Sequence, residues 1–281
     1  MIDLHTHTTC SDGTDRPRDL VNKAIVQGLE VLGISDHDTT SGWEEATQAL
    51  RGTLQLALGA EISCLTTDGI SVHMLGMLFD PNHKEMQTVL TETRDGRLPR
   101  MRKMIEKMRA EGMDISIADV EKAMPVGATM GRPHLADALV AKKIIKSRDE
   151  AFIDLLHNDS RFYVSHAAPT PAEAIALIRR AGGVAIIAHP FASHRGKILK
   201  AEDFADLVIA GLNGIEVDHR DQNTDERAML RVIARELDLV VTGSSDYHGT
   251  GKLNSLAENH TSREQWLKLE SQADARRVVN A

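Results

Sequence analysis

The feature that most constrains the fold is a series of seven short apolar segments, six of which end at or just before a histidine, aspartate or glutamate. Segments of this length, bounded by turn residues, are typical of buried β-strands. The predicted strands are residues 2–5, 30–35, 54–61, 70–76, 184–188, 214–217 and 239–245. Helical patterns lie between several of them, at residues 17–27, 44–51, 171–181 and 225–236. This alternation predicts an α/β fold, specifically a β/α barrel of seven strands.

One long stretch interrupts the alternation. Residues 80–165 contain helical patterns but no convincing strand, and these patterns cover residues 97–111, 117–122, 133–142 and 149–157. We therefore predict a helical insertion between the fourth and fifth strands. The barrel would then comprise residues 1–79 and 166–281.

Charge and composition exclude several classes of partner. The formal net charge is −8, whereas nonspecific binding of duplex nucleic acid needs a broad cationic surface. Small anionic substrates remain compatible with this charge. No apolar run approaches the roughly 18 to 20 residues of a membrane helix, and residues 1–3 do not resemble the start of a signal peptide. Two cysteines are too few for a disulfide framework. We expect a cytoplasmic protein with no membrane contact and no obligatory protein partner.

Histidine is the residue type that directs the functional interpretation. The chain has 13 histidines against five phenylalanines and two tyrosines, and imidazole is a common ligand of divalent transition metals. The carboxyl ends of the strands in a β/α barrel surround one mouth, where catalytic groups gather. Because side chains alternate along a strand, His5 and His7 point the same way and can hold one ion. The other polar residues at these positions are Asp36, His37, Glu61, His73, His189, Asp246 and His248.

Each position also has an interpretation that involves no function. His73 fits a hydrogen-bonded core or surface histidine, and Asp12 before Gly13 fits a simple turn. Residues 36–39 could cap a helix, and residues 246–249 could form a polar loop. These explanations would have to hold independently at six strand ends, which favours a shared metal site.

The combination of motifs resembles the PHP (polymerase and histidinol phosphatase) family. The matching segments, in the order of the family, are DLHTHTTCSDG, LGISDHDT, GAEIS, VHMLG, IAHP and GSSDYHG. A further segment, GRPHLADAL, resembles the subgroup of metal-dependent phosphoesterases that includes 3′,5′-nucleoside bisphosphate phosphatases and 5′-to-3′ exonucleases acting on short RNA. The resemblance implies a distorted, TIM-like barrel of seven strands with two or three divalent ions in its mouth.

The resemblance also implies which side chains hold these ions. The first ion would be bound by His5, His7, Glu61 and Asp246, the second by Asp12, His37 and His248, and the third by Glu61, His73 and His189. Some relatives have histidine in place of Asp12, and a carboxylate there favours Mn²⁺ or Fe²⁺ over Zn²⁺. Asp36 and Asp38 are not needed as ligands. One of them could orient a ligand histidine, and Asp38 could equally cap a helix.

Cations in the predicted insertion could select the substrate. Arg97 and Arg100 share a helical face, and Arg132 and His134 begin a helix whose amino terminus could bind a phosphate. The expected substrate-binding residues are Arg97, Arg100, Arg132, His134, Arg161 and Arg195. The expected catalytic residues are Asp12, His37 and Asp246, with His194 near the leaving group. The arginines could instead be solvated surface residues, and His166 and His219 fit either kind of role.

These residues predict a metal-dependent phosphoesterase. Neighbouring dications lower the pKa of a bridging water and stabilise the attacking and leaving oxygens. A substrate-capping insertion rich in arginine would hold a second anionic group. The preferred substrate is a nucleoside 3′,5′-bisphosphate cleaved at its 3′-phosphate, and the AMP-like product would also bind. A 5′-to-3′ exonuclease acting on short single-stranded oligonucleotides is the alternative. A non-catalytic PHP binding module is a further alternative, which the intact set of ligands disfavours.

Overall fold

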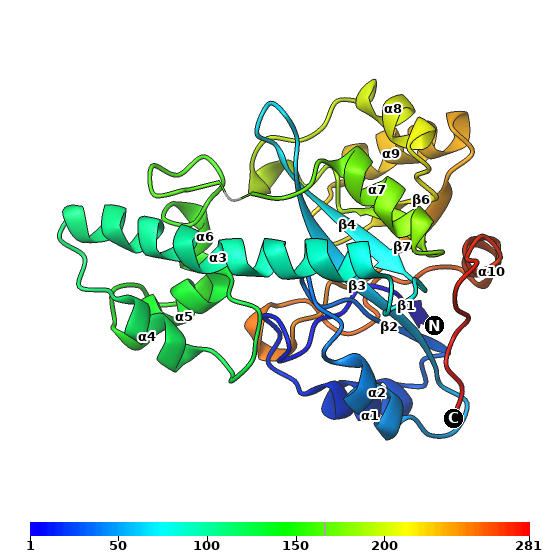
Figure 1. Cartoon of the computed structure of the whole chain (residues 1–281), viewed down its shortest axis with the longest axis horizontal. Coiled ribbons are helices and arrows are strands. Elements are labelled where there is room, and N and C mark those ends of the chain that lie inside the picture. Colours follow the sequence, from blue (N-terminus) through cyan, green and yellow to red (C-terminus); the bar gives the residue numbers. More distant parts are fainter. Residues whose placement is uncertain (166) are drawn as a thin grey trace.

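A mixed sheet of seven strands, nearly closed into a barrel, forms the centre of the molecule (Figure 1). The structure is a computed structural model that describes residues 1–165 and 167–281. The strands, adjacent in sequence order, are β1 (Ile2–Asp3), β2 (Val31–Ile34), β3 (Gln55–Leu65), β4 (Ser71–Met77), β5 (Val184–Ala188), β6 (Gly214–Asp218) and β7 (Val240–Gly243). An isolated parallel bridge between Thr6 and Tyr247 joins the segments that follow β1 and β7. The predicted seven strands and their barrel arrangement are therefore confirmed.

Strand β4 departs from the expected alternation because it runs antiparallel to both β3 and β5. A tight turn joins β3 directly to β4, and Gly69 supplies its left-handed backbone (φ +86°). The Asp68-Gly69 pair between two apolar runs is the hairpin signal for this reversal. As a result, the first residues of β4 lie beside the last residues of β5, and His73 pairs with Ala188. His73 thus reaches the barrel mouth although it does not end its strand.

The helical insertion between the fourth and fifth strands is confirmed, but its first helix is much longer than the predicted residues 97–111. The helices of this segment are α3 (Lys84–Ala110), α4 (Ile117–Ala123), α5 (Arg132–Ala141) and α6 (Arg148–Ile153). Buried α3 residues recur every three or four positions, from Met86 through Leu90 and Thr93 to Arg97 and beyond. This buried stripe supports the helix across Pro99, although charged residues between its members obscure the pattern in the sequence.

Helix α3 contributes to two separate hydrophobic cores. Its first turns place Met86 and Leu90 in the large core between the sheet and the outer helices. Its later turns place Met101 and Met104 in a second core, where they join Leu135 of α5. Figure 1 shows α3 extending from beside the sheet across the other helices of the insertion. The two cores therefore share one helix, about 40 Å long at 1.5 Å per residue.

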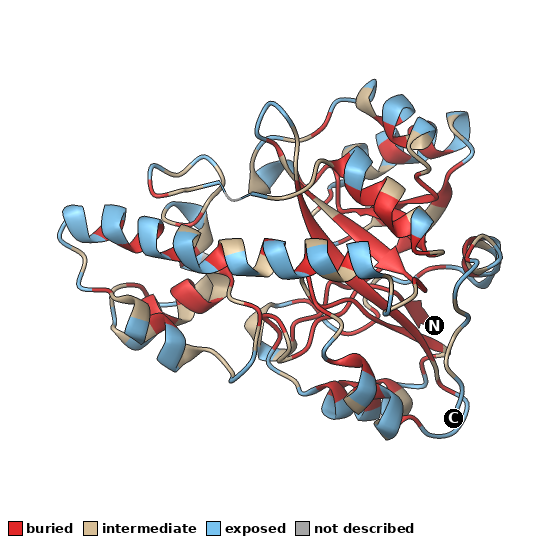
Figure 2. Cartoon of the chain, in the orientation of Figure 1, coloured by how far each residue is buried: buried red, intermediate tan, exposed pale blue. Residues whose placement is uncertain are grey.

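Six further helices pack around the sheet. They are α1 (Pro17–Gln27), α2 (Trp43–Ala49), α7 (Pro171–Arg180), α8 (Asp203–Ile209), α9 (Thr224–Glu236) and α10 (Arg263–Glu270). Figure 2 shows the strands almost entirely buried and the helices exposed along their outer faces. Within the described part of the chain, no helix combines the length and the apolar composition needed to cross a membrane.

Candidate metal centre

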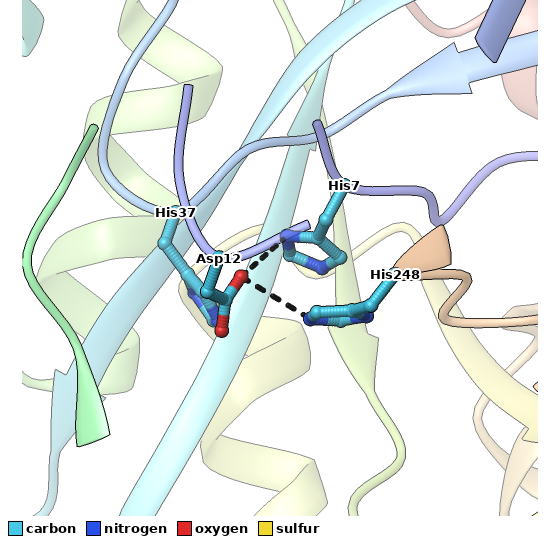
Figure 3. Close-up of side chains that lie close together, drawn as sticks. All are labelled: His7, Asp12, His37 and His248. Atoms are coloured by element: carbon cyan, nitrogen blue, oxygen red, sulfur yellow. Dashed lines mark ion pairs between the residues drawn. The ribbon is translucent and has the colours of Figure 1, made fainter. Parts of the chain in front are cut away.

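The structure brings the side chains predicted as metal ligands together at one end of the sheet. They are His5, His7, Asp12, His37, Glu61, His73, His189, Asp246 and His248. Figure 3 shows the imidazoles of His7, His37 and His248 gathered around the Asp12 carboxylate. Most of this cluster is withdrawn from solvent. Ionisable groups are buried in such numbers only when they are paired or bind a cation.

The first group surrounds a point between β1, β3 and β7. The Glu61 Oε2 atom lies 3.3 Å from His5 Nε2 and 3.1 Å from His7 Nε2. Asp246 Oδ1 lies 3.5 Å and 3.4 Å from the same two nitrogens. Ligand atoms around a tetrahedral ion at about 2.1 Å are separated by about 3.4 Å. His5, His7 and Glu61 therefore lie close enough together to hold one divalent ion, and Asp246 Oδ1 lies beside both histidines.

The second group is centred on Asp12. Its Oδ1 atom lies 3.2 Å from His248 Nε2, and its Oδ2 atom lies 3.7 Å from His37 Nε2. Asp12 Oδ1, His37 Nδ1 and His248 Nε2 are buried without a hydrogen-bond partner among the described residues. Buried polar atoms of this kind are costly unless something binds them. A cation between these side chains would satisfy Asp12 and His248 directly.

The third group lies on the other side of Glu61. The Oε1 atom of Glu61 is 2.7 Å from His73 Nδ1 and 3.4 Å from His189 Nε2. Since Oε2 faces His5 and His7, the two oxygens of this carboxylate point toward different sets of histidines. Glu61 is thus placed to contact two ions at once.

The protonation states of the cluster suit cation binding. Burial lowers the pKa of His189 to about 3 and that of His248 to about 4, so both imidazoles are neutral at neutral pH. Burial opposes ionisation of Glu61, but the surrounding histidines hold its pKa well below the usual range. Burial also opposes protonation of His7, yet Asp246 and Glu61 raise its pKa to about 9. A metal ion binding to His7 would displace that proton.

The loop that carries Asp12 is held by Asp36, which follows β2. The Asp36 carboxylate accepts hydrogen bonds from the Thr8 backbone N–H (2.7 Å) and from the Ser11 hydroxyl (2.6 Å). Ser11 Oγ lies 3.3 Å from His7 Nδ1, so Asp36 orients His7 through this serine. Gly13 lets the loop fold back, because a Cβ atom there would lie 2.5 Å from the His7 carbonyl oxygen.

Glu216 belongs to the centre although the sequence analysis does not identify it. This fully buried residue of β6 places Oε1 3.0 Å from His5 Nδ1 and accepts the His189 backbone N–H through Oε2 (2.9 Å). A carboxylate on the outer nitrogen of a ligand histidine fixes its tautomer and orientation. The sequence does contain a feature that could have identified this residue: a glutamate lies inside the apolar segment 214–217, and a buried carboxylate needs a partner.

Asp246 has a second set of neighbours on the side away from His5 and His7. Its Oδ2 atom lies 2.7 Å from Lys252 Nζ, 3.0 Å from Arg195 Nη2 and 3.4 Å from His219 Nε2. Lys252 is absent from the predicted site, whereas His219, left open by the sequence, is buried here. Asp246 therefore connects the cluster of predicted metal ligands to the cations of Lys252 and Arg195. His166 lies outside the described residues.

One cavity of about 700 Å³ connects this centre to the helical insertion. Asp12, His37, His73 and His189 line one wall, and Arg97, Arg100 and Arg132 line another. A phosphate ester bound in this cavity could contact both walls.

Two of the predicted substrate-binding arginines form a closely spaced pair of cations. Arg132 donates hydrogen bonds to the Leu156 carbonyl (2.7 Å) and to Asn158 Oδ1 (2.6 Å), whereas Arg100 donates to the Val164 carbonyl (2.6 Å). Burial lowers the pKa of both guanidinium groups, and other nearby arginines lower it further. No carboxylate among their described partners neutralises them. An anion entering the cavity would relieve this unbalanced charge.

The other predicted substrate residues occupy different surroundings. Arg161 ion-pairs with Glu111 on the surface and is not part of the cavity wall. His134 is buried and accepts the Gly131 backbone N–H through Nδ1 (3.1 Å), which caps α5.

Two predicted residues that follow β5 do line the cavity. Arg195 binds Asp221 and Asp246, and the exposed His194 places Nε2 3.7 Å from Asp221 Oδ1. Arg195 is therefore already paired with two carboxylates, while His194 keeps most of its imidazole open to the cavity rim.

Comparison with known proteins assigns the family. The PHP domain pattern matches residues 3–146. A 5′-3′ exoribonuclease of Haemophilus influenzae is 34% identical over 88% of this chain and 89% of its own length. A 3′,5′-nucleoside bisphosphate phosphatase of Chromobacterium violaceum is 30% identical over 89% of this chain and 88% of its own length.

Solved structures agree with this assignment. The crystal structure of a proposed metal-dependent phosphoesterase from Bifidobacterium adolescentis superposes with a TM-score of 0.90 at 39% identity, and the match covers 97% of this chain and 96% of that chain. The chain therefore belongs to the PHP domain family and is a metal-dependent phosphoesterase.

Proposed function

We propose that this phosphoesterase removes the 3′-phosphate from nucleoside 3′,5′-bisphosphates. The observation that carries the proposal is a shared cavity, which is lined both by members of the metal-ligating cluster and by the Arg100–Arg132 pair. A nucleoside bisphosphate carries two anions on one ribose, one for the ions held at the mouth and one for the arginines of the opposite wall. Binding energy at the remote 5′-phosphate can orient the 3′-phosphate for in-line attack and raise the rate of the chemical step.

The proposed cofactors are two or three divalent ions, Mn²⁺, Fe²⁺ or Zn²⁺, held by the three groups of side chains described above. The carboxylate of Asp12 makes the second group hard and anionic, which favours Mn²⁺ or Fe²⁺. When bound, the ions would activate water as the nucleophile and neutralise the phosphoryl oxygens. Asp12, His37 and Asp246 would fix the reacting geometry, and His194, at the cavity rim, would protonate the leaving oxygen.

The test is the position of the phosphate that is released. Adenosine 3′,5′-bisphosphate, incubated with enzyme loaded with each metal in turn, should yield inorganic phosphate and adenosine 5′-monophosphate. Phosphorus NMR distinguishes this product from the 3′-monophosphate. Accumulation of the 3′-monophosphate would show that the substrate binds in the opposite orientation, and no release with any metal would refute the proposal.

A 5′-to-3′ exonuclease acting on short RNA is the second candidate. The Haemophilus influenzae relative, which carries that name, supports it. A cavity of about 700 Å³ has room for the terminal nucleotide of an oligomer, and the Arg100–Arg132 pair would then hold its 5′-phosphate. A 5′-phosphorylated RNA pentamer should release mononucleotides stepwise from the 5′ end. The ratio of kcat/KM for this pentamer and for the bisphosphate decides between the two candidates.

A further inference from the structure

A buried ion pair connects α3 to the loop that follows β2. Arg97 is only 7% exposed, and Asp38 is fully buried. Arg97 Nε donates to Asp38 Oδ2 (3.1 Å), and Nη2 donates to the same oxygen. Nη2 also donates to Ser63 Oγ (2.8 Å), and Nη1 donates to the Met130 carbonyl (3.1 Å). All three guanidinium nitrogens are therefore engaged by protein acceptors.

Asp38 holds two segments that carry predicted metal ligands. It directly follows His37 and adopts a left-handed backbone (φ +52°), which is uncommon outside glycine and needs support from the surroundings. Its carboxylate accepts hydrogen bonds from the Ser63 backbone N–H (2.8 Å) and hydroxyl (3.0 Å). Ser63 lies two residues beyond Glu61, whose carbonyl accepts the Asp38 N–H (3.0 Å). The Asp38 side chain thus ties the His37 segment to the Glu61 strand.

A second arginine of α3 reinforces this connection. Arg94, one helical turn before Arg97, donates to the Asp38 carbonyl oxygen (2.9 Å). Two arginines of the insertion therefore donate hydrogen bonds to the residue next to His37, one to its backbone carbonyl and one to its side chain. His37 Nδ1 in turn lies 3.1 Å from Glu61 Oε2, so a displacement of the loop would change the distance between two predicted ligands.

We infer that Arg97 is a positioning residue for the metal centre, acting through Asp38, and that it does not bind the substrate phosphate. This inference rests on the proposed roles of His37 and Glu61 as metal ligands. It separates Arg97 from Arg100, which lies three residues further along α3 and has no carboxylate partner among the described residues. Removal of Arg97 would leave the Asp38 carboxylate buried and unpaired, which destabilises the loop that carries His37.

The test compares metal binding with substrate binding in matched variants. Mn²⁺ affinity is measured in the full-length protein by electron paramagnetic resonance of free Mn²⁺, and KM and kcat are measured at saturating Mn²⁺. Arg97→Gln should weaken the Mn²⁺ site that contains His37 by about 10- to 100-fold, with KM near the wild-type value. Arg100→Gln should raise KM and leave Mn²⁺ affinity unchanged. Arg97→Lys should recover part of the affinity, because it restores the charge without the planar fork.

A second variant keeps the test decisive if Arg97→Gln folds poorly. Asp38→Asn removes the charge on the other side of the pair and should weaken the same Mn²⁺ site. The double variant should bind Mn²⁺ no more weakly than the worse single variant, because the two residues act as one unit. Wild-type Mn²⁺ affinity in Arg97→Gln or Asp38→Asn, with a raised KM, would overturn the inference. A wild-type protein that binds none of Mn²⁺, Fe²⁺ and Zn²⁺ would instead refute the proposed metal centre itself.

Discussion

The barrel mouth and the helical insertion face each other across one cavity, yet their charged side chains are organised in opposite ways. At the mouth, histidines and carboxylates lie close together, and several of their buried atoms have no hydrogen-bond partner in the described part of the chain, as suits a cation site. On the insertion side, Arg100 and Arg132 are half-buried and have no carboxylate among their described partners. One wall is built to attract cations and the other to attract anions, and a metal-bound phosphate ester would satisfy both.

This difference has a structural origin. The predicted ligands at the mouth are placed by the backbone, since strand ends and the short loops that follow them fix each side chain relative to the sheet. Arginines of the insertion reach the cavity on long side chains whose positions depend on which acceptors lie nearby. Substitutions at the mouth are therefore expected to abolish hydrolysis. Substitutions in the insertion are expected to change which substrate the enzyme prefers.

The largest effect is expected at the mouth. Asp246→Asn removes the charge of a carboxylate that faces His5 and His7, so kcat should fall by on the order of 10³-fold or more, together with loss of bound metal. Steady-state kinetics and metal analysis check both results. Asp218→Asn is the matched control, because Asp218 ends β6 but pairs with Arg231 outside the cavity. Near wild-type kcat in Asp246→Asn would remove Asp246 from the centre.

A selective effect is expected in the insertion. Arg132→Ala should reduce kcat/KM for a nucleoside bisphosphate. The loss should correspond to about 2 to 4 kcal/mol of transition-state stabilisation, because a charge-assisted contact to the remote phosphate is removed. Hydrolysis of an aryl phosphate, which has no second anion, should change little. Arg161→Ala, which alters an exposed arginine paired with Glu111, should affect neither substrate. Equal losses on both substrates would place Arg132 at the reaction centre.

A further prediction for the barrel concerns Glu216, which supports His5 and is not itself a predicted metal ligand. Glu216→Gln removes the negative charge beside His5 Nδ1 and should weaken metal affinity by about 10- to 100-fold. Competition with a coloured chelator measures this change. Excess metal should restore most of the turnover, whereas a loss that metal cannot rescue would mean that Glu216 contacts the substrate or the reacting atoms.

A graded change in metal affinity is expected with pH. The pKa of His7 in the metal-free protein is raised to about 9, and metal binds only the neutral imidazole. Metal affinity should therefore rise with pH up to about 9, by about tenfold per unit for each displaced proton. Calorimetric titrations at pH 7.5 in two buffers of different ionisation enthalpy would count those protons. No proton release would contradict the protonated state of His7.

The difference between the barrel mouth and the insertion also explains how much of the site could be predicted from the sequence. Histidines at strand ends could be assigned because alternation along a strand fixes their direction, as it does for His5 and His7. Even β4, which runs antiparallel to both of its neighbours, brings His73 to the barrel mouth. Glu216 escapes prediction because it lies inside a strand, where a single buried carboxylate has no local pattern to mark its partner.

Roles in the insertion depend on contacts that are distant in sequence. Arg97 is engaged by Asp38, 59 positions away, and Arg161 by Glu111, 50 positions away. Helical spacing places Arg97 and Arg100 on one face but does not indicate which of them meets a carboxylate. His134 shows the converse, since its Nδ1 accepts the backbone N–H of Gly131, only three residues away, and so caps α5.

Helix α3, which is shared by two hydrophobic cores, limits how far the insertion can be treated as a transferable module. Excising residues 84–110 together with the insertion would remove Met86 and Leu90 from the barrel and expose the surface they cover. A chimera that exchanges specificity between relatives would therefore need its crossover inside the helix, after Leu90 and before Met101. Arg94 and Arg97 lie within that interval, so the choice of crossover also decides which parent supplies the support for Asp38.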